Sequence, residues 1–449
     1  MKKRFLRLGD SGVARLVAAL FLACSVAVAA HDSSEAPIRL AASEHANEVV
    51  AIDHFVDHIS TVPANAGQLV RLFVRERVRA DHEGKGRKSD HEEKPRKAVL
   101  MVHGLSVPVL PGMALNVADY DWSESLARSG LDVFMLDFQG SGRSPHPNRD
   151  ILDTARVGAT SERVMDQPCN VPASDQKQVL IPYQLSATCS PHYPFQLINS
   201  KSDWDELDTV VDYIRALRGV EKVALVSWSQ GSFRVGPYAV QHPEKVESLF
   251  LLAAIFNPTF RPDPPAPVPG TPMSLRTRSD LMNKLWNPEI HCEGQVEDGI
   301  QDLVWSSIMD NDDVGRTWGP PPPHSPAGSP PEGVMRVRTP VLWGWNSATA
   351  RKLQVPVLII AGEFDTGGGG IQNFAQLYVD IPHNHKLWFK VQCAGHYLPW
   401  ERQRKVLHHI SRQWLKNGAV EGCTRGKFFV DTEGRLSLQD APDPAAICE

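Results

Sequence analysis

The fold is decided by the stretch Val223-Ala224-Leu225-Val226-Ser227-Trp228-Ser229-Gln230-Gly231. Its first four apolar residues are typical of a buried strand, and small residues then surround a serine. Where a strand turns sharply into a helix, a serine at the turn presents its hydroxyl above the sheet edge. Such a turn is crowded, so the positions two before and two after the serine need small residues, here Ser227 and Gly231. We therefore interpret Ser229 as a nucleophile. Ser227 fits this role less well, because Leu225 would then occupy a crowded position.

Short apolar runs recur on both sides of this stretch and alternate with amphipathic, helix-like patterns. The runs hold few charges and many Val, Ile, Leu and Phe residues, as strands buried on both faces of a parallel sheet do. They cover residues 99–102, 131–136, 223–226, 249–254, 355–360 and 386–391, and helices are expected over 202–217 and 404–415. Residues 49–61 and 68–79 alternate like an antiparallel edge pair. The pattern predicts an α/β fold with a mostly parallel, twisted sheet flanked by helices.

Two later residues are the expected partners of Ser229. A serine hydroxyl is a poor nucleophile until a base takes its proton, and a carboxylate orients that base. On a sheet of this kind the acid and the base follow late strands, in the order Ser, acid, His. Asp365 follows one late apolar run and His396 follows the last one, so we expect Asp365 as the acid and His396 as the base. Glu363 is the second candidate for the acid.

An oxyanion formed during acyl transfer needs fixed N–H donors. The backbone N–H of Gln230, directly after the nucleophile, is one expected donor. The turn after the first apolar run reads His103-Gly104-Leu105, and we expect the N–H of Leu105 to be the second. Gly104 would let the backbone approach closely there.

These motifs together resemble those of the α/β-hydrolase superfamily, in its serine esterase and lipase-like form. His103-Gly104 resembles the family's oxyanion turn, and residues 137–144 (Asp-Phe-Gln-Gly-Ser-Gly-Arg-Ser) resemble its Asp-x-x-Gly-x-Gly-x-Ser loop. The family's triad is matched in order and strand position by Ser229, Asp365 and His396. The sequence departs from the pattern at Ser227, where the family usually has Gly. The resemblance spans about residues 98–415 and implies hydrolysis of an ester, amide or lactone bond without a metal or a cofactor.

Two insertions interrupt the alternating pattern. The second is rich in Trp and Pro and is too long for a simple connector, so we expect it to form a cap. The expected organisation is a signal peptide (1–30), N-terminal strands and a charged loop (31–97), a hydrolase core (98–256 and 355–417, with an insertion at about 145–201), the cap (257–354) and a C-terminal tail (418–449).

The N-terminus is typical of a secretory signal peptide. Basic residues precede an apolar run over residues 16–30, and Ala27-Val28-Ala29 offers small residues for cleavage. The run is short for a membrane span, which needs about 20 residues. We expect a periplasmic or secreted chain with no stable membrane span after cleavage, in preference to an uncleaved anchor or a lipid anchor at Cys24.

Cysteine usage fits export. An even number of cysteines follows the signal segment, which favours disulfides in an exported chain: Cys169, Cys189, Cys292, Cys393, Cys423 and Cys448. Neighbours in sequence suggest the pairs Cys169–Cys189 and Cys423–Cys448, with Cys393 the best candidate for a small buried residue instead. No Cys-x-x-Cys pair or His/Cys cluster has metal-ligand spacing, so we expect no metal. The net charge of −5 implies no basic face, so we expect no nucleic-acid partner.

Three functions are compatible with these features. The first is hydrolysis of a carboxylic ester or lactone of a small, apolar substrate. The second is an aminopeptidase of the proline-iminopeptidase type, which would need cap carboxylates to bind a free amine; the candidates are Asp310, Asp312 and Asp313, or Glu297 and Asp298. The third is a non-catalytic binding protein on a hydrolase scaffold.

Overall fold

The computed structural model describes residues 48–63, 66–82, 96–105, 107–144, 198–268, 273–439 and 447–448. The expected signal peptide, with Cys24, lies outside these ranges, as does the expected pair Cys169–Cys189. In the described part no helix is long and apolar enough to cross a membrane.

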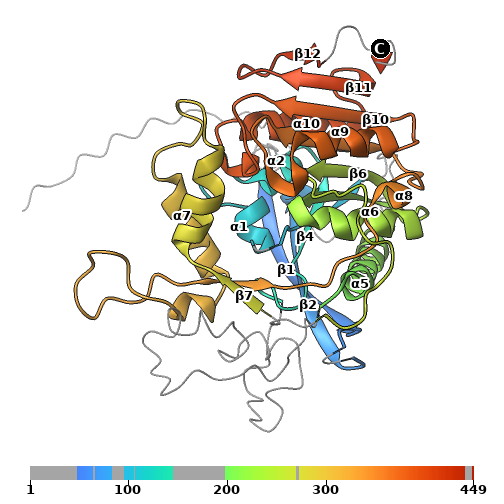
Figure 1. Ribbon diagram of the computed structural model, residues 1–449. Helices are drawn as coiled ribbons and strands as arrows, with labels where there is room; N and C mark the ends of the chain where they lie inside the picture. The colour runs from blue at the N-terminus through green and yellow to red at the C-terminus, as the bar shows by residue number, and fades with distance from the viewer. Residues whose placement is uncertain are drawn as a thin grey trace, which may run out of the picture.

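One eleven-stranded sheet forms the centre of the described structure (Figure 1). Its order is β1-β2-β4-β3-β5-β6-β9-β10-β11-β12, and β13 pairs with β11. Strands β4 through β11 in this order are parallel, with antiparallel strands at both edges. The strands are β1 (Val49–Ile59), β2 (Leu69–Arg79), β3 (Ala98–Val102), β4 (Asp132–Leu136), β5 (Val223–Trp228), β6 (Val246–Leu252), β9 (Val357–Gly362), β10 (Lys386–Val391), β11 (Cys423–Val430), β12 (Leu436–Leu438) and β13 (Ile447–Cys448). The predicted mostly parallel α/β sheet is confirmed.

Both faces of this sheet are buried, because successive side chains of each strand point to opposite sides. In β3, Val99 and Met101 pack into one apolar cluster, whereas Leu100 and Val102 pack into another. Helices α1 (Val109–Met113), α2 (Trp122–Arg128) and α10 (Arg404–Asn417) contribute to the first cluster. Helices α5 (Ser200–Arg218), α6 (Ser232–Gln241) and α9 (Ile371–Asp380) contribute to the second. This double burial explains why the central strands are almost free of charged residues.

Residues 418–449, which the sequence suggested as a tail, contribute strands to the sheet. Strand β11 pairs in parallel with β10, and β12 and β13 pair with β11. A disulfide joins Cys423 of β11 to Cys448 of β13, as their nearness in sequence suggested. The sheet therefore continues past β10 (Figure 1, red strands).

Residues 257–354 are the segment that the sequence predicts to be a cap. Its described part holds β7 (Met273–Arg276), β8 (Met335–Arg338), η6 (Asp280–Trp286), η7 (Asn287–Glu289), α7 (Ile300–Asp310), η8 (Gly315–Thr317) and α8 (Ser347–Ala350). Helix α8 lies apart from α7 and packs on α6 and α9, so this end of the segment belongs to the helical layer of the sheet (Figure 1). Trp286 is fully buried, and its ring lies 5.3 Å from that of Trp400, which follows β10. A disulfide also joins Cys292 of the cap to Cys393 of the loop after β10. The reading of Cys393 as a free buried thiol is therefore wrong; its partner lies 101 residues away, too far for sequence to indicate.

Candidate active site

Ser229 occupies a strained turn between β5 and α6. Its φ of +57° is uncommon for a residue other than glycine, and such strain is concentrated at functional sites. The turn is crowded from two sides. A Cβ on Gly231 would lie 3.0 Å from the carbonyl oxygens of Val102 and His103, and a Cβ on Gly104 would lie 3.1 Å from that of Ser229. These contacts explain why small residues occur here.

The structure brings Ser229, His396 and Asp365 into one hydrogen-bonded chain. Nε2 of His396 lies 2.9 Å from Oγ of Ser229, and Nδ1 of His396 lies 2.9 Å from Oδ1 of Asp365. With its proton on Nδ1, donated to Asp365, the imidazole can accept the serine proton at Nε2. The Asp365 side chain is fully buried, which shields this hydrogen bond from water.

Glu363, the second candidate for the acid, lies elsewhere. Its Oε2 accepts a 3.3 Å hydrogen bond from the N–H of Cys393 and makes no hydrogen bond with the imidazole. Ser227 is buried, and its hydroxyl has no hydrogen-bond partner among the described residues. Neither side chain is placed to take part in proton transfer with His396.

A buried cap residue that the sequence did not reveal, Glu289, holds both loops of the site. Its Oε2 accepts a 2.5 Å hydrogen bond from the N–H of His396. Its Oε1 accepts from the N–H and the hydroxyl of Thr366, at 2.9 and 2.6 Å, directly after Asp365. One carboxylate therefore fixes the backbone next to the acid and the backbone of the base. A lone glutamate in a cap has no sequence signature, so only the fold could identify it.

The electrostatic surroundings of His396 favour its charged form. Burial alone lowers the pKa of His396, but the carboxylates of Asp365, Glu289 and Glu401 outweigh burial, and the pKa is raised above 6.5. Burial raises the pKa of Glu401 itself to about 7. Glu401 accepts a 2.7 Å hydrogen bond from the N–H of Gly395, the residue before the base. Such surroundings stabilise the imidazolium that forms when a serine loses its proton.

The turn expected to bind an oxyanion is rigid. Arg234 of α6 donates hydrogen bonds to the carbonyl oxygens of His103 and Gly104, at 2.5 and 3.2 Å. Its guanidinium is ion-paired with buried Asp203 at 2.8 Å. These contacts fix the peptide groups that precede Leu105, whose side chain lines the same cavity as Ser229. Gln230 directly follows Ser229, so both expected donors belong to turns that adjoin the nucleophile.

His103 has a structural place in this turn. Its Nδ1 donates to the carbonyl oxygen of Gly104 at 2.7 Å, and its Nε2 accepts from the N–H of Phe138 at 3.4 Å. Burial, reinforced by the charges of Arg234 and Arg338, lowers the pKa of His103 well below its usual value. Because both ring nitrogens of this neutral imidazole are hydrogen-bonded, His103 is not available as a second base.

A cavity of about 330 Å³ opens onto Ser229 and His396. Its core-side wall includes Leu105, Val107, Trp228, Ile255 and Tyr397. Its cap-side wall is formed by Arg276, Lys284, Leu285, Pro288 and Glu289. This volume lies at the lower end of the range typical of small-molecule sites, about 300–1,000 Å³. Core residues and residues of the 257–354 segment thus line together a space of small-molecule size at the hydroxyl of Ser229.

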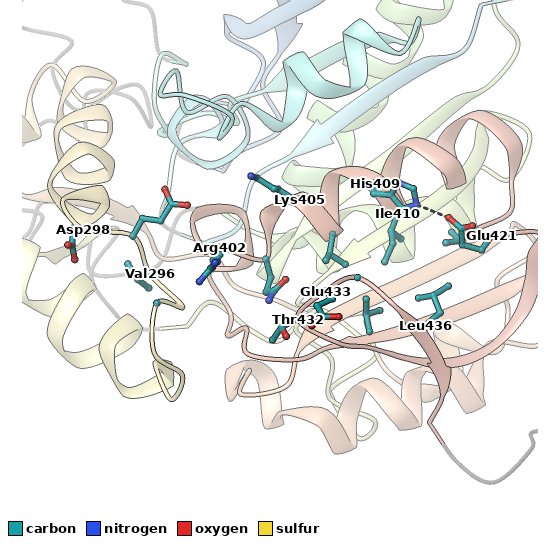
Figure 2. A pocket seen from close by; sticks show the side chains of 17 residues that line it. Val296, Asp298, Arg402, Lys405, His409, Ile410, Glu421, Thr432, Glu433 and Leu436 are labelled. Carbon is teal, nitrogen blue, oxygen red and sulfur yellow. Dashed lines mark hydrogen bonds and ion pairs between the residues drawn. The ribbon is translucent and has the colours of Figure 1, made fainter.

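A larger cavity, of about 1070 Å³, lies between residues 294–298 of the cap, α10 and the β11–β12 hairpin (Figure 2). Ser229, His396 and Asp365 do not line it. Several of its charged groups are already paired: His409 lies 2.7 Å from Glu421 (dashed line in Figure 2), and Glu297 lies 2.9 Å from Arg404. Volume alone therefore does not identify the candidate active site. We place that site at the smaller cavity, because Ser229 and His396 line it.

The strand order and the serine turn after β5 define an α/β hydrolase fold. Residues 97–275 also match the family model described as alpha/beta hydrolase fold. The chain therefore has the α/β-hydrolase fold that its motifs predict. No curated protein matches the chain in sequence.

Solved structures with which the chain shares similarity include several hydrolases. A thermophilic esterase from Thermogutta terrifontis is 15% identical, with 81% of this chain and 98% of that chain covered and a TM-score of 0.43. The naproxen esterase from Bacillus subtilis is 13% identical (82% and 92% covered, TM-score 0.41). The 2-hydroxy-6-oxo-6-phenylhexa-2,4-dienoate hydrolase from Rhodococcus sp. strain RHA1 is 15% identical (80% and 96% covered, TM-score 0.41). Likeness at this level assigns no activity to the chain.

Proposed function

We propose that the protein is a serine hydrolase that cleaves a carboxylic ester or lactone through an acyl-enzyme. The observation that carries this proposal is the hydrogen-bonded chain from Ser229 through His396 to Asp365, with 2.9 Å at each step, at the wall of a cavity. Nucleophile, base and orienting acid are the minimum set for such chemistry.

The steps follow from this geometry. Nε2 of His396 takes the proton as Oγ of Ser229 attacks the carbonyl carbon, and the N–H groups of Leu105 and Gln230 are the proposed donors to the oxyanion. His396 then gives the proton to the departing alcohol. Water, deprotonated by the same imidazole, attacks the acyl-enzyme and releases the acid. Loss of one oxyanion donor typically costs about 3–4 kcal/mol of transition-state stabilisation.

The cavity supports ester cleavage over aminopeptidase activity. The cap carboxylates considered for amine binding do not line the cavity at Ser229. Asp312 is buried and paired with Arg336, and Glu297 is paired with Arg404. Glu289, the one acid among the described residues that line the cavity, already accepts hydrogen bonds at both oxygens. A substrate ammonium group would therefore lack a free carboxylate.

We further propose that the protein is exported, to the periplasm or to the exterior. Support comes from the signal-like N-terminus and from two disulfides in the described residues, Cys292–Cys393 and Cys423–Cys448. Disulfides persist in oxidising compartments and are rare in the cytosol.

A fluorophosphonate probe and a panel of 4-nitrophenyl esters, lactones and aminoacyl amides test the proposed activity. We expect the probe to label Ser229 and the protein to hydrolyse esters. Ser229→Ala should lose labelling and at least about 10³-fold in kcat, as removal of a triad serine does. Ser227→Ala is the matched control and should keep both, because its hydroxyl makes no hydrogen bond among the described residues. A folded protein with no label and no turnover would favour the binding-protein alternative.

A further inference from the structure

The cavity at Ser229 carries more positive charge than an apolar ester needs. Arg276 and Lys284 both line it, from β7 and from η6 of the cap. Lys284 is largely exposed and is paired with Asp280 at 2.6 Å. Glu289, the acid in the same wall, is occupied by backbone and hydroxyl donors. Arg276 therefore remains as a half-buried cation in the lining of the cavity that Ser229 also lines.

Neighbouring arginines show that Arg276 is unusual. Arg278 lies beside Asp302 and within 4.0 Å of Glu332, Arg336 is paired with Asp312, and Arg338 is paired with Asp203. Within the part of the chain that the structure describes, Arg276 alone among these four has no acidic partner. Removing a cation partly from water without a counter-ion costs free energy. An anionic group on a bound ligand would supply the counter-ion that Arg276 lacks.

Arg276 lines the same cavity as Ser229 and His396, so a substrate that fills this cavity can contact all three. Tyr397 follows the base directly and lines the same cavity; burial raises the pKa of Tyr397, and the charge of Arg276 opposes that shift. The two walls of the cavity thus differ in polarity. Apolar side chains such as Leu105, Val107 and Ile255 lie on the core side, whereas Arg276 lies on the cap side.

We propose that Arg276 binds a carboxylate on the substrate, so that the natural substrates are small esters or lactones that carry an anionic group. This inference rests on the proposed ester hydrolase activity and replaces the purely apolar substrate expected from the sequence. A guanidinium presents paired N–H donors that match the two oxygens of a carboxylate, and such charge-assisted bonds are both strong and directional. The cap would then select substrates by charge, while the core supplies the nucleophile and the base.

The test compares matched anionic and neutral esters. Mono-4-nitrophenyl adipate and its methyl ester place the charge in the acyl group; 4-carboxyphenyl butyrate and its methyl ester place it in the leaving group. The readout is the ratio of kcat/KM for the anionic ester to that for its neutral partner, after subtraction of the rate with Ser229→Ala. We expect wild-type protein to favour the anionic member of at least one pair. Arg276→Gln should lower that ratio about tenfold to hundredfold, the effect of one hydrogen-bonded charge pair.

Two further variants make the result specific. Arg278→Gln, which removes an equal charge outside the cavity, should keep the wild-type ratio. Arg276→Glu should invert the preference, towards an ester with a trimethylammonium group. Circular dichroism and thermal unfolding show that each variant is folded, and 4-nitrophenyl butyrate reports the basal reaction.

The outcomes separate this inference from the proposed function. Hydrolysis of the neutral esters with the same charge ratio in wild type, Arg276→Gln and Arg276→Glu would overturn the inference and leave the ester hydrolase standing. An equal fall in the ratio with Arg278→Gln would also overturn it, because the effect would then be one of overall charge. Absence of turnover on all the esters, with Ser229 unlabelled, would overturn the proposed function and the inference with it.

Discussion

His396 is held at each of its polar atoms. Its N–H donates to Glu289, and its carbonyl oxygen accepts a 2.9 Å hydrogen bond from the indole N–H of Trp228. Its two ring nitrogens contact Asp365 and Ser229. Four partners from three segments of the chain therefore fix both the position and the ring orientation of one imidazole. A base held this way loses little entropy when it receives the proton of Ser229.

The first prediction concerns pH. Attack by Ser229 requires a neutral His396, and the pKa of His396 is raised above 6.5 because the nearby carboxylates outweigh burial. The kcat/KM for neutral 4-nitrophenyl butyrate should therefore rise with pH through a midpoint above 6.5. Asp365→Asn should move this midpoint to lower pH and lower kcat by about 10⁴-fold, as in serine proteases. Rate profiles between pH 5 and 9 measure both, and an acid limb centred below pH 6 in wild type would contradict the prediction.

The second prediction concerns Glu289. Glu289→Gln replaces an acceptor oxygen by an NH₂ group that faces the N–H of either His396 or Thr366. We expect kcat to fall about tenfold to hundredfold and the free energy of unfolding to fall by about 1–3 kcal/mol, the cost of an unsatisfied buried group. The acid limb should also move to lower pH, because one of the charges that raise the pKa of His396 is lost.

Glu293 offers the matched control for Glu289. It is exposed and lies four residues further along the same cap segment. Glu293→Gln should leave kcat, the pH profile and stability unchanged. A loss of stability in Glu289→Gln with an unchanged pH profile would show that Glu289 is structural only and does not act on the base.

At the scale of elements, the sequence predicts the parts of the site that are tied to strand ends. Ser229, Asp365 and His396 each follow a buried apolar run, and the carboxyl ends of parallel strands meet at one edge of a sheet. The cap follows no such rule. Its two antiparallel strands, β7 and β8, pair residues that are about 60 positions apart in the sequence. Neither Glu289 nor Arg276 could therefore be assigned a place in the cavity from the sequence.

Strand β11 also escaped the sequence pattern, for a reason that its position explains. It lies near the edge of the sheet, where half of its side chains remain partly exposed, and charged residues such as Arg425 and Lys427 are tolerated there. The inward-facing residues are clear only once the register is known. Phe428 stacks on Phe389 of β10, with ring centroids 5.3 Å apart.

The third prediction tests this part of the sheet. Phe428→Ala removes a buried ring that stacks on Phe389 and should lower the free energy of unfolding by about 3–5 kcal/mol. Phe429→Ala, on the opposite and half-exposed side of the same strand, should cost roughly 1 kcal/mol. Urea denaturation of the two variants measures the difference. Equal and small losses would mean that residues 418–449 are not part of the folded sheet.

On the scale of the whole molecule, the cap and the core are joined next to the reactive groups. Cys292 of the cap is bonded to Cys393, three residues before His396, and Glu289 contacts the same loop. Residues that shape the cavity and residues that carry the proposed chemistry are therefore held by one set of contacts. The disulfide between Cys423 and Cys448 lies in the sheet extension instead.

The last prediction follows from this difference. Replacing Cys292 and Cys393 by Ala opens a loop of 101 residues and should lower the free energy of unfolding by about 4–5 kcal/mol on the chain-entropy estimate. It should also lower kcat, because the loop that carries His396 loses its tie to the cap. Replacing Cys423 and Cys448, which are 25 residues apart, should cost about 3–4 kcal/mol and leave kcat unchanged.

Non-reducing peptide mapping identifies the two bonds, and urea denaturation and ester hydrolysis measure the effects. Alkylation of Cys292 and Cys393 in the unreduced protein, or an equal kcat in the two double variants, would show that this bond does not hold the base.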